Sequence, residues 1–89
     1  PGADAHAGRV ETSLMLALDP AQVDLAASAV GEIGPLEEIL PALRARGVRA
    51  VSPNGVLGDP AGSSAELGRS ILSGMAELCG AALDALLAS

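Results

Sequence analysis

The residue best suited to acid–base chemistry is His6, the single histidine in this chain of 89 residues. It lies among small residues, with Asp4 two positions before it and Glu11 five positions after it. Because an imidazole can take up or release a proton near neutral pH, His6 beside these carboxylates could act as a general acid or base. The spacing alone leaves a second interpretation open, an exposed loop histidine without a chemical role.

Other residues with polar or reactive side chains favour structural roles. Ser13 has no G-x-S-x-G sequence around it, so we expect it within a helix rather than at a nucleophile elbow. Cys79 falls on the apolar stripe of a predicted helix, which indicates a core position. The Gly-rich segment 54–62 could receive an anion at a helix N-terminus, but it lacks a P-loop lysine, so we interpret it as a turn. One histidine with scattered carboxylates cannot build a catalytic zinc site, so we expect no metal ligand in this chain.

The composition excludes several classes of function. Five arginines against 11 acidic residues give a formal net charge of −6, opposite in sign to a nucleic-acid-binding surface. The chain has no aromatic side chain to stack on bases, and its single cysteine cannot form an internal disulfide. No apolar run approaches the roughly 18 residues of a membrane span, and no signal peptide opens the chain. We therefore expect a cytoplasmic protein without a nucleic-acid or membrane partner.

The first half of the chain is expected to form helices that position these residues. Apolar spacing predicts a helix from Val10 to Leu18, which Asp19-Pro20 ends, because the residue before a proline avoids the helical conformation. Residues 21–29 are expected to add one or two helical turns. A further helix is predicted over 36–46 in spite of Pro41, with Gly47 as the residue that ends it.

The second half is expected to contain one strand, a long loop and a long helix. The alternating segment 48–51 is rich in valine, which favours a strand. Three glycines and two prolines between 52 and 62 predict loop and turn. A stripe of apolar residues predicts a helix over about 64–87, opened by a capping box in which Ser63 and Glu66 bond to each other's backbone.

The length allows one small domain and no more. One strand and a few helices rich in leucine and alanine do not make a sheet, so these helices lack a surface to pack on. The chain also opens on Pro1 without a methionine, and a polar segment follows at once. We therefore expect it to be a piece of a longer protein.

Three motifs together resemble one known family. The segment 4–15, DAHAGRVETSLM, resembles the H-A-G-x-x-E-T-S segment of the creatininase (creatinine amidohydrolase) family. Downstream, Gly55–Pro60 and Ser64–Gly68 are similar to the G-x-x-G-D-P and A-S-A-E-x-G stretches of that family, in the same order. The resemblance covers nearly the whole chain, although residues 24–46 contain no motif that is specific to the family.

The resemblance implies a fold larger than this chain. Members of the family are α/β domains with three layers, a mostly parallel sheet between helices, and they commonly assemble as homo-oligomers. Residues 1–89 resemble the C-terminal, mainly helical portion of one such domain. The metal-binding E-x-H-G and N-G-H-G-G-N-type segments of the family do not occur here. The implied divalent metal ions, which could be zinc, iron or manganese, are therefore expected in an N-terminal portion that this chain lacks.

The resemblance also implies roles for two residues. The histidine that matches His6 passes a proton to the leaving nitrogen, and the glutamate that matches Glu11 supports it, so both are predicted as catalytic residues. The sequence of residues 48–60 is most similar to one branch of this family. Members of that branch are peptidases that release a C-terminal dipeptide from a ribosomally made precursor peptide. Two alternatives stay open: another amidohydrolase of the family that acts on a cyclic or formyl amide, and a non-catalytic helical interaction module.

Overall fold

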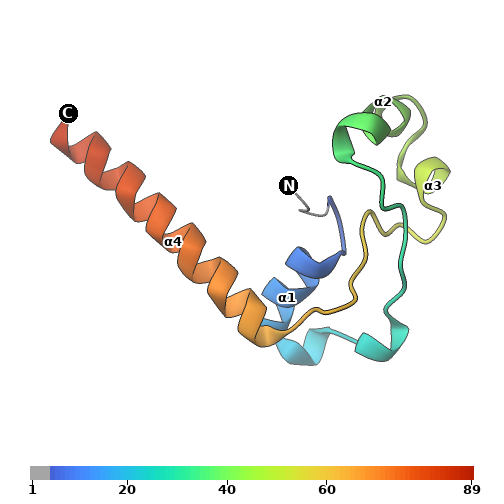
Figure 1. The fold of residues 1–89 in the computed structure, drawn as a ribbon, viewed down its shortest axis with the longest axis horizontal. Helices are drawn as coiled ribbons and strands as arrows, with labels where there is room; N and C mark the ends of the chain where they lie inside the picture. The colour runs from blue at the N-terminus through green and yellow to red at the C-terminus, as the bar shows by residue number, and fades with distance from the viewer. Residues whose placement is uncertain (1–4) are drawn as a thin grey trace.

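The long helix α4 (Ala65–Ala88) crosses the short helix α1 (Arg9–Leu18) near its own N-terminus and then extends away from the rest of the chain (Figure 1). The structure is a computed structural model that describes residues 5–89. Two 3-10 turns, Pro20–Gln22 and Leu25–Ala27, lead from α1 to α2 (Leu36–Arg46), and the single turn α3 (Val48–Val51) follows. The molecule is elongated, with extents of 47 × 32 × 19 Å.

The predicted helices α1 and α2 are confirmed within one residue of their expected ends. Helix α1 has Glu11 in its first turn, and Asp19 leaves the helical conformation directly before Pro20. In α2 the first turn is acidic and the last turn is basic, which complements the helix macrodipole at both ends. Gly47, at a φ of +84°, ends α2 as predicted, and the helix continues through Pro41.

The strand predicted over 48–51 is wrong, because these residues form α3, one helical turn. The Ser52 N–H donates to the Val48 carbonyl oxygen at 2.8 Å, and α3 packs against α2. A valine-rich segment forms a strand only where a neighbouring strand can pair with it, and the described residues offer none. The helical turns predicted over 21–29 appear as the two 3-10 turns.

Helix α4 begins one residue later than expected, and the predicted capping box is wrong. Ser64 is the capping residue, and its hydroxyl oxygen accepts a hydrogen bond from the Leu67 N–H at 3.0 Å. Glu66 therefore lies at the second helical position, where its carboxylate cannot complete the box. The Ser63 hydroxyl donates instead to the carbonyl oxygen of Pro60.

The closest packing lies where α1 crosses α4, at Ser13 and Gly68. Ser13 is fully buried, and its hydroxyl oxygen accepts a hydrogen bond from the Ser64 N–H at 3.1 Å. A Cβ at Gly68 would overlap the carbonyl oxygen of Ser13 and touch the side chain of Ala17. The crossing therefore needs a residue without a side chain at position 68, and it confirms the prediction of Ser13 as a helix residue.

The remainder of α4 is exposed within the described residues. Every residue from 73 to 89 is exposed, including five large apolar ones. These are Met75, Leu78, Leu83, Leu86 and Leu87. Cys79 is also exposed, so its predicted core position is wrong for the described residues.

By length and composition alone, α4 could cross a membrane. The expectation that no segment could do so is therefore wrong, because an apolar window with two acidic residues still qualifies. This finding does not distinguish a membrane-spanning helix from the core helix of a soluble protein, because both pass the same test. Glu77 and Asp84 both lie in the exposed part of this helix.

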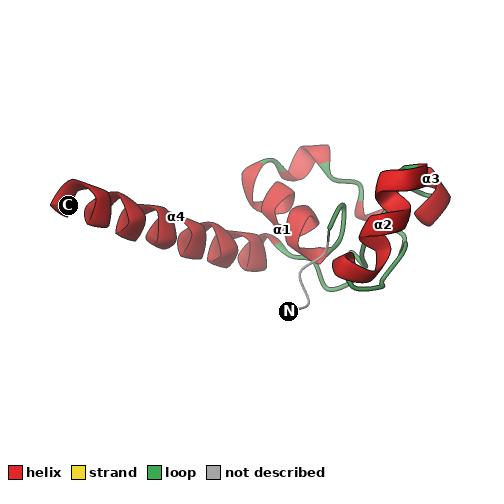
Figure 2. Ribbon diagram, turned by 90° about the horizontal axis from the view of Figure 1, so that it is seen from above, coloured by secondary structure: helices red, strands yellow, loops and turns green. Residues whose placement is uncertain are grey.

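The described residues form no strand, as Figure 2 shows. The nearest approach to β structure is an isolated antiparallel bridge between His6 and Leu57. A mainly helical structure fits the expected C-terminal portion of a three-layer domain, and the parallel sheet itself stays a prediction. The loop expected over residues 1–4 lies outside the described residues.

Residues 1–89 alone are expected to self-associate or to unfold without a cooperative transition, because most of the apolar surface of α4 has nothing to pack on. Light scattering after size-exclusion chromatography measures the first, and a thermal melt followed by circular dichroism measures the second. A monomer with a sharp melt would contradict this prediction.

In the full-length protein, Gly68→Ala is expected to lower the free energy of unfolding by about 1–3 kcal/mol, because the new methyl group forces α1 and α4 apart. Gly74→Ala is the matched control on the same helix, since open space surrounds the position of its Cβ. There we expect no loss and a gain of up to about 1 kcal/mol from helix propensity. Urea denaturation measures both variants, and equal losses would refute the close approach at Gly68.

Candidate functional site

The backbone of His6 is fixed by pairing with Leu57. The Leu57 N–H donates to the His6 carbonyl oxygen at 2.9 Å, and the His6 N–H donates back to the Leu57 carbonyl oxygen at 3.2 Å. The Leu57 side chain is buried and anchors this pairing. The His6 side chain takes no part in it and is 56% exposed, so the imidazole is accessible to a ligand.

Glu11 closes the turn between His6 and α1. Its Oε2 accepts a hydrogen bond from the Ala7 N–H at 2.7 Å, and the Thr12 hydroxyl donates to the Ala7 carbonyl oxygen at 3.3 Å. Ala7 has a φ of +56°, a left-handed conformation that costs a non-glycine residue about 1 kcal/mol. Two hydrogen bonds from the first turn of α1 therefore hold a backbone conformation that alanine disfavours.

The same carboxylate oxygen lies next to the imidazole. Glu11 Oε2 is 3.2 Å from His6 Nδ1, which is ion-pair distance when the ring is protonated. An exposed pair of this kind adds little stability. Its consequence is orientation, because a proton on Nδ1 directed to Glu11 leaves Nε2 as the ring nitrogen that can meet a ligand. The structure thus brings together the two predicted residues, while Asp4 lies outside the described residues.

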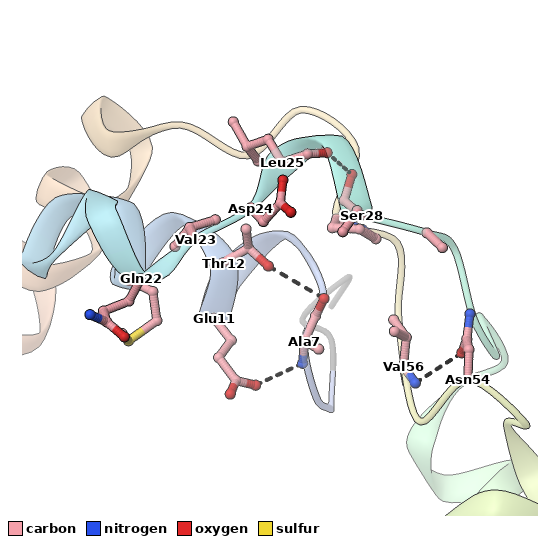
Figure 3. A pocket seen from close by; sticks show the side chains of 14 residues that line it. Ala7, Glu11, Thr12, Gln22, Val23, Asp24, Leu25, Ser28, Asn54 and Val56 are labelled. Atoms are coloured by element: carbon pink, nitrogen blue, oxygen red, sulfur yellow. Dashed lines mark hydrogen bonds between the residues drawn. The ribbon is translucent and has the colours of Figure 1, made fainter.

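A cavity of about 360 Å³ opens beside Glu11 (Figure 3). Its walls come from α1, from the segment 22–29 and from the loop 54–60. Glu11 and Thr12 line it from α1, and Asp24 lines it from the segment 22–29. His6 is not a lining residue, whereas its partner Glu11 is one.

Asn54, which no sequence pattern singled out, joins the loop 54–60 to Val30, the residue directly after the wall segment 22–29. Its Oδ1 accepts hydrogen bonds from the Ser52 hydroxyl at 2.8 Å and the Val56 N–H at 3.0 Å. Its Nδ2 donates to the Val30 carbonyl oxygen at 2.9 Å. The Asn54-Gly55 pair signals a turn in the sequence, but no local pattern shows that the amide reaches a residue 24 positions earlier.

The Gly-rich segment 54–62, considered above as an anion site, has a structural role. The Gly-rich loop before α4 uses its polar groups internally, as the Asp59 carboxylate accepts from the Ala61 N–H at 3.0 Å. At the N-terminus of α4, the N–H groups of Ser64 and Leu67 already have serine partners. This supports the interpretation of residues 54–62 as a turn that delivers the helix.

No group of three or more metal-binding side chains occurs among residues 5–89. These residues therefore do not fit the divalent metal ions that the family resemblance implies. We derive no step through a metal from this chain.

The sequence matches one family and several curated relatives. The model of the family described as creatinine amidohydrolase matches residues 1–83. A protein from Mycobacterium ulcerans named mycofactocin precursor peptide peptidase is 49% identical over 78 residues. Proteins with the same name from Mycobacterium tuberculosis and Mycolicibacterium smegmatis are 47% and 43% identical over 79 residues. No solved structure matches the chain at a significant level.

The coverage of these matches is unequal. They include 88% to 89% of this chain but only 31% to 32% of each relative. The chain therefore spans about a third of the length of the curated relatives it matches.

Asn54→Ala is expected to lower the free energy of unfolding of the full-length protein by about 1–3 kcal/mol, because it leaves the buried Ser52 hydroxyl and the Val30 carbonyl without their partner. Ser28→Ala is the control on the opposite wall. It removes one exposed hydrogen bond to the Leu25 carbonyl oxygen and should cost less than about 0.5 kcal/mol. Urea denaturation compares the two, and similar small losses would show that Asn54 does not join the walls.

Proposed function

Because this chain belongs to the creatininase (creatinine amidohydrolase) family, we propose that the full-length protein hydrolyses an amide bond with His6 and Glu11 in its active site. Residues 1–89 form the C-terminal portion of its single domain in this proposal. The contact of 3.2 Å between His6 Nδ1 and Glu11 Oε2 is the observation that carries it.

The substrate we propose is a precursor peptide. The relatives at 43% to 49% identity are named mycofactocin precursor peptide peptidase, and this supports the same class of substrate here. We propose that the reaction releases a C-terminal dipeptide from the mycofactocin precursor. The names of the relatives support the substrate class, and the resemblance of residues 48–60 to the peptidase branch supports the position of the cut.

His6 would deliver the proton that the reaction requires. Hydrolysis adds a hydroxyl group to the carbonyl carbon, breaks the carbon–nitrogen bond and adds a proton to the departing nitrogen. An amine anion is a poor leaving group, so a positioned general acid speeds the step. Nε2 of His6 is the atom proposed to give this proton, and Glu11 is the positioning residue that holds Nδ1.

Any metal ion in the active site would be bound by residues outside the described ones. Creatininase-family proteins are generally metal-dependent, and we propose zinc, iron or manganese as the divalent ion. Its ligands would come from the N-terminal portion of the domain, since residues 5–89 offer no suitable group. When bound, such an ion would polarise the amide carbonyl or activate water.

A second candidate keeps the chemistry and changes the substrate. The family description names creatinine amidohydrolase, so hydrolysis of a cyclic or formyl amide by the same pair is the alternative. A direct comparison of hydrolysis rates on a precursor peptide and on creatinine decides between them.

The setting of the enzyme is also a proposal. The exposed apolar residues of α4 support assembly into a homo-oligomer, in which part of this surface would be buried. A cytoplasmic location agrees with the single unpaired cysteine, since disulfides are rare in that compartment.

Loss of the His6 side chain should damage the chemical step. In the full-length protein, His6→Ala is expected to lower kcat by about 10² to 10⁴-fold with KM little changed, as removal of a general acid does. Glu11→Gln should lower kcat by a smaller factor, again with KM little changed. Steady-state kinetics and metal content are measured on the same preparations.

The control is Glu38→Gln, which changes an exposed carboxylate on α2 and should leave kcat unchanged. If His6→Ala lost its metal and regained activity with excess metal, His6 would be a ligand rather than an acid. Full metal content with undiminished turnover would refute its role altogether. A full-length protein that hydrolyses no amide substrate would instead favour the non-catalytic interaction module, whose feature in this chain is the exposed apolar surface of α4.

A further inference from the structure

Ala7 adopts a disfavoured backbone conformation directly after His6. Among residues 5–89 it is the one non-glycine residue with a positive φ, at +56°. The Cβ of alanine disfavours this left-handed conformation, which glycine adopts freely. The angle φ is the rotation about the bond between the N and Cα atoms of Ala7, and His6 lies directly on the N side of that bond. It therefore sets how His6 is turned relative to α1 and to Glu11.

Thr12 holds the carbonyl group of this turn from the first turn of α1. Its hydroxyl donates to the Ala7 carbonyl oxygen at 3.3 Å, as Figure 3 shows. The Thr12 N–H donates to the Gly8 carbonyl oxygen at 3.0 Å, so the start of the helix fixes the place of the hydroxyl. Glu11 holds the other side of Ala7, because its Oε2 accepts from the Ala7 N–H at 2.7 Å. The two side chains thus hold the two peptide groups on either side of the Ala7 Cα.

The orientation of the imidazole depends on this turn. Glu11 Oε2 lies 3.2 Å from His6 Nδ1 and also accepts from the Ala7 N–H, so it meets both groups only while their peptide faces α1. Without the Thr12 bond, the preference of alanine for a negative φ would turn this peptide, and the imidazole with it, away from Glu11. Thr12 therefore acts on His6 through Ala7.

We propose that Thr12 is a positioning residue, whose hydroxyl holds the left-handed turn at Ala7 and thereby keeps the His6 imidazole facing Glu11. The inference rests on the proposed function, in which His6 is the general acid. Thr12 also lines the cavity beside Glu11, so direct binding of substrate is the competing role. A positioning residue acts on kcat through the backbone of Ala7, whereas a substrate-binding residue acts on KM.

Thr12→Val and Thr12→Ser are the matched pair for the test, because valine keeps the shape of threonine and serine keeps its hydroxyl. They are made in the full-length protein and assayed with whichever of the precursor peptide and creatinine the unaltered protein hydrolyses. Thr12→Val is expected to lower kcat by about threefold to tenfold with KM little changed, the factor that one hydrogen bond supplies. Thr12→Ser should keep most of kcat. Thr12→Ala removes the same hydroxyl and takes the place of Thr12→Val if circular dichroism shows that the latter is unfolded.

A second substitution tests the route through Ala7. Glycine adopts a positive φ without the cost of a Cβ, so Ala7→Gly added to Thr12→Val should restore most of the lost kcat. Ala5→Gly is the matched control on the other side of His6, since Ala5 has no positive φ, and it should restore nothing. A loss of kcat that Ala7→Gly does not offset, or a raised KM, would overturn the proposal and assign Thr12 to substrate binding.

Hydrogen exchange provides a readout that does not depend on turnover. The Ala7 N–H should exchange about threefold to tenfold faster in Thr12→Val, because the turn opens more often, and at the unaltered rate in Thr12→Ser. If neither substrate is hydrolysed but exchange changes as expected, the proposed function fails and the hold of Thr12 on the turn is supported. If hydrolysis occurs but Thr12→Val matches the unaltered protein in kcat and in exchange, the positioning role is overturned and the function stands.

Discussion

The absence of a side chain at Gly68 is the constraint on which the arrangement of this chain depends. It lets the backbone of α4 approach that of α1 at Ser13, and the Ser13 hydroxyl oxygen then accepts a hydrogen bond from the N–H of Ser64, the capping residue of α4. Because the loop that ends at α4 also contains Leu57, this crossing sets where the partner of His6 lies. A contact between two helices thus determines the position of a histidine that neither helix contains.

The candidate site is built from backbone on one side and from a single carboxylate on the other. Leu57 fixes the main chain of His6, and Glu11 fixes both the following turn and the ring. Both side chains remain about half exposed, so the described residues support the pair from one side and leave its other side open. Such a half-built site agrees with a chain that spans about a third of its relatives.

The sequence predicts well what depends on local spacing and poorly what depends on distant partners. The apolar periods of α1, α2 and α4 and the stop at Gly47 depend on neighbouring residues, and the structure confirms them. The segment 48–51 was predicted wrongly because its preference for a strand needs a partner strand. The partners of Asn54 and Gly68 were not predicted, because each lies more than 20 positions away in the sequence. Ser63 was predicted as the capping residue instead of Ser64, because two adjacent serines give the same local signal for a helix start. The meeting of His6 with Glu11 was expected from a family resemblance rather than from spacing.

The pairing of His6 with Leu57 has a consequence for the order of folding. The loop that it closes contains most of the first two thirds of the chain, and loop closure costs entropy before the contact returns any free energy. During synthesis, His6 leaves the ribosome long before Leu57 and the first turns of α4 follow. The imidazole therefore reaches its place only after Leu57 has also been made. An incomplete nascent chain would carry the histidine and its glutamate but would lack the backbone partner that aligns them.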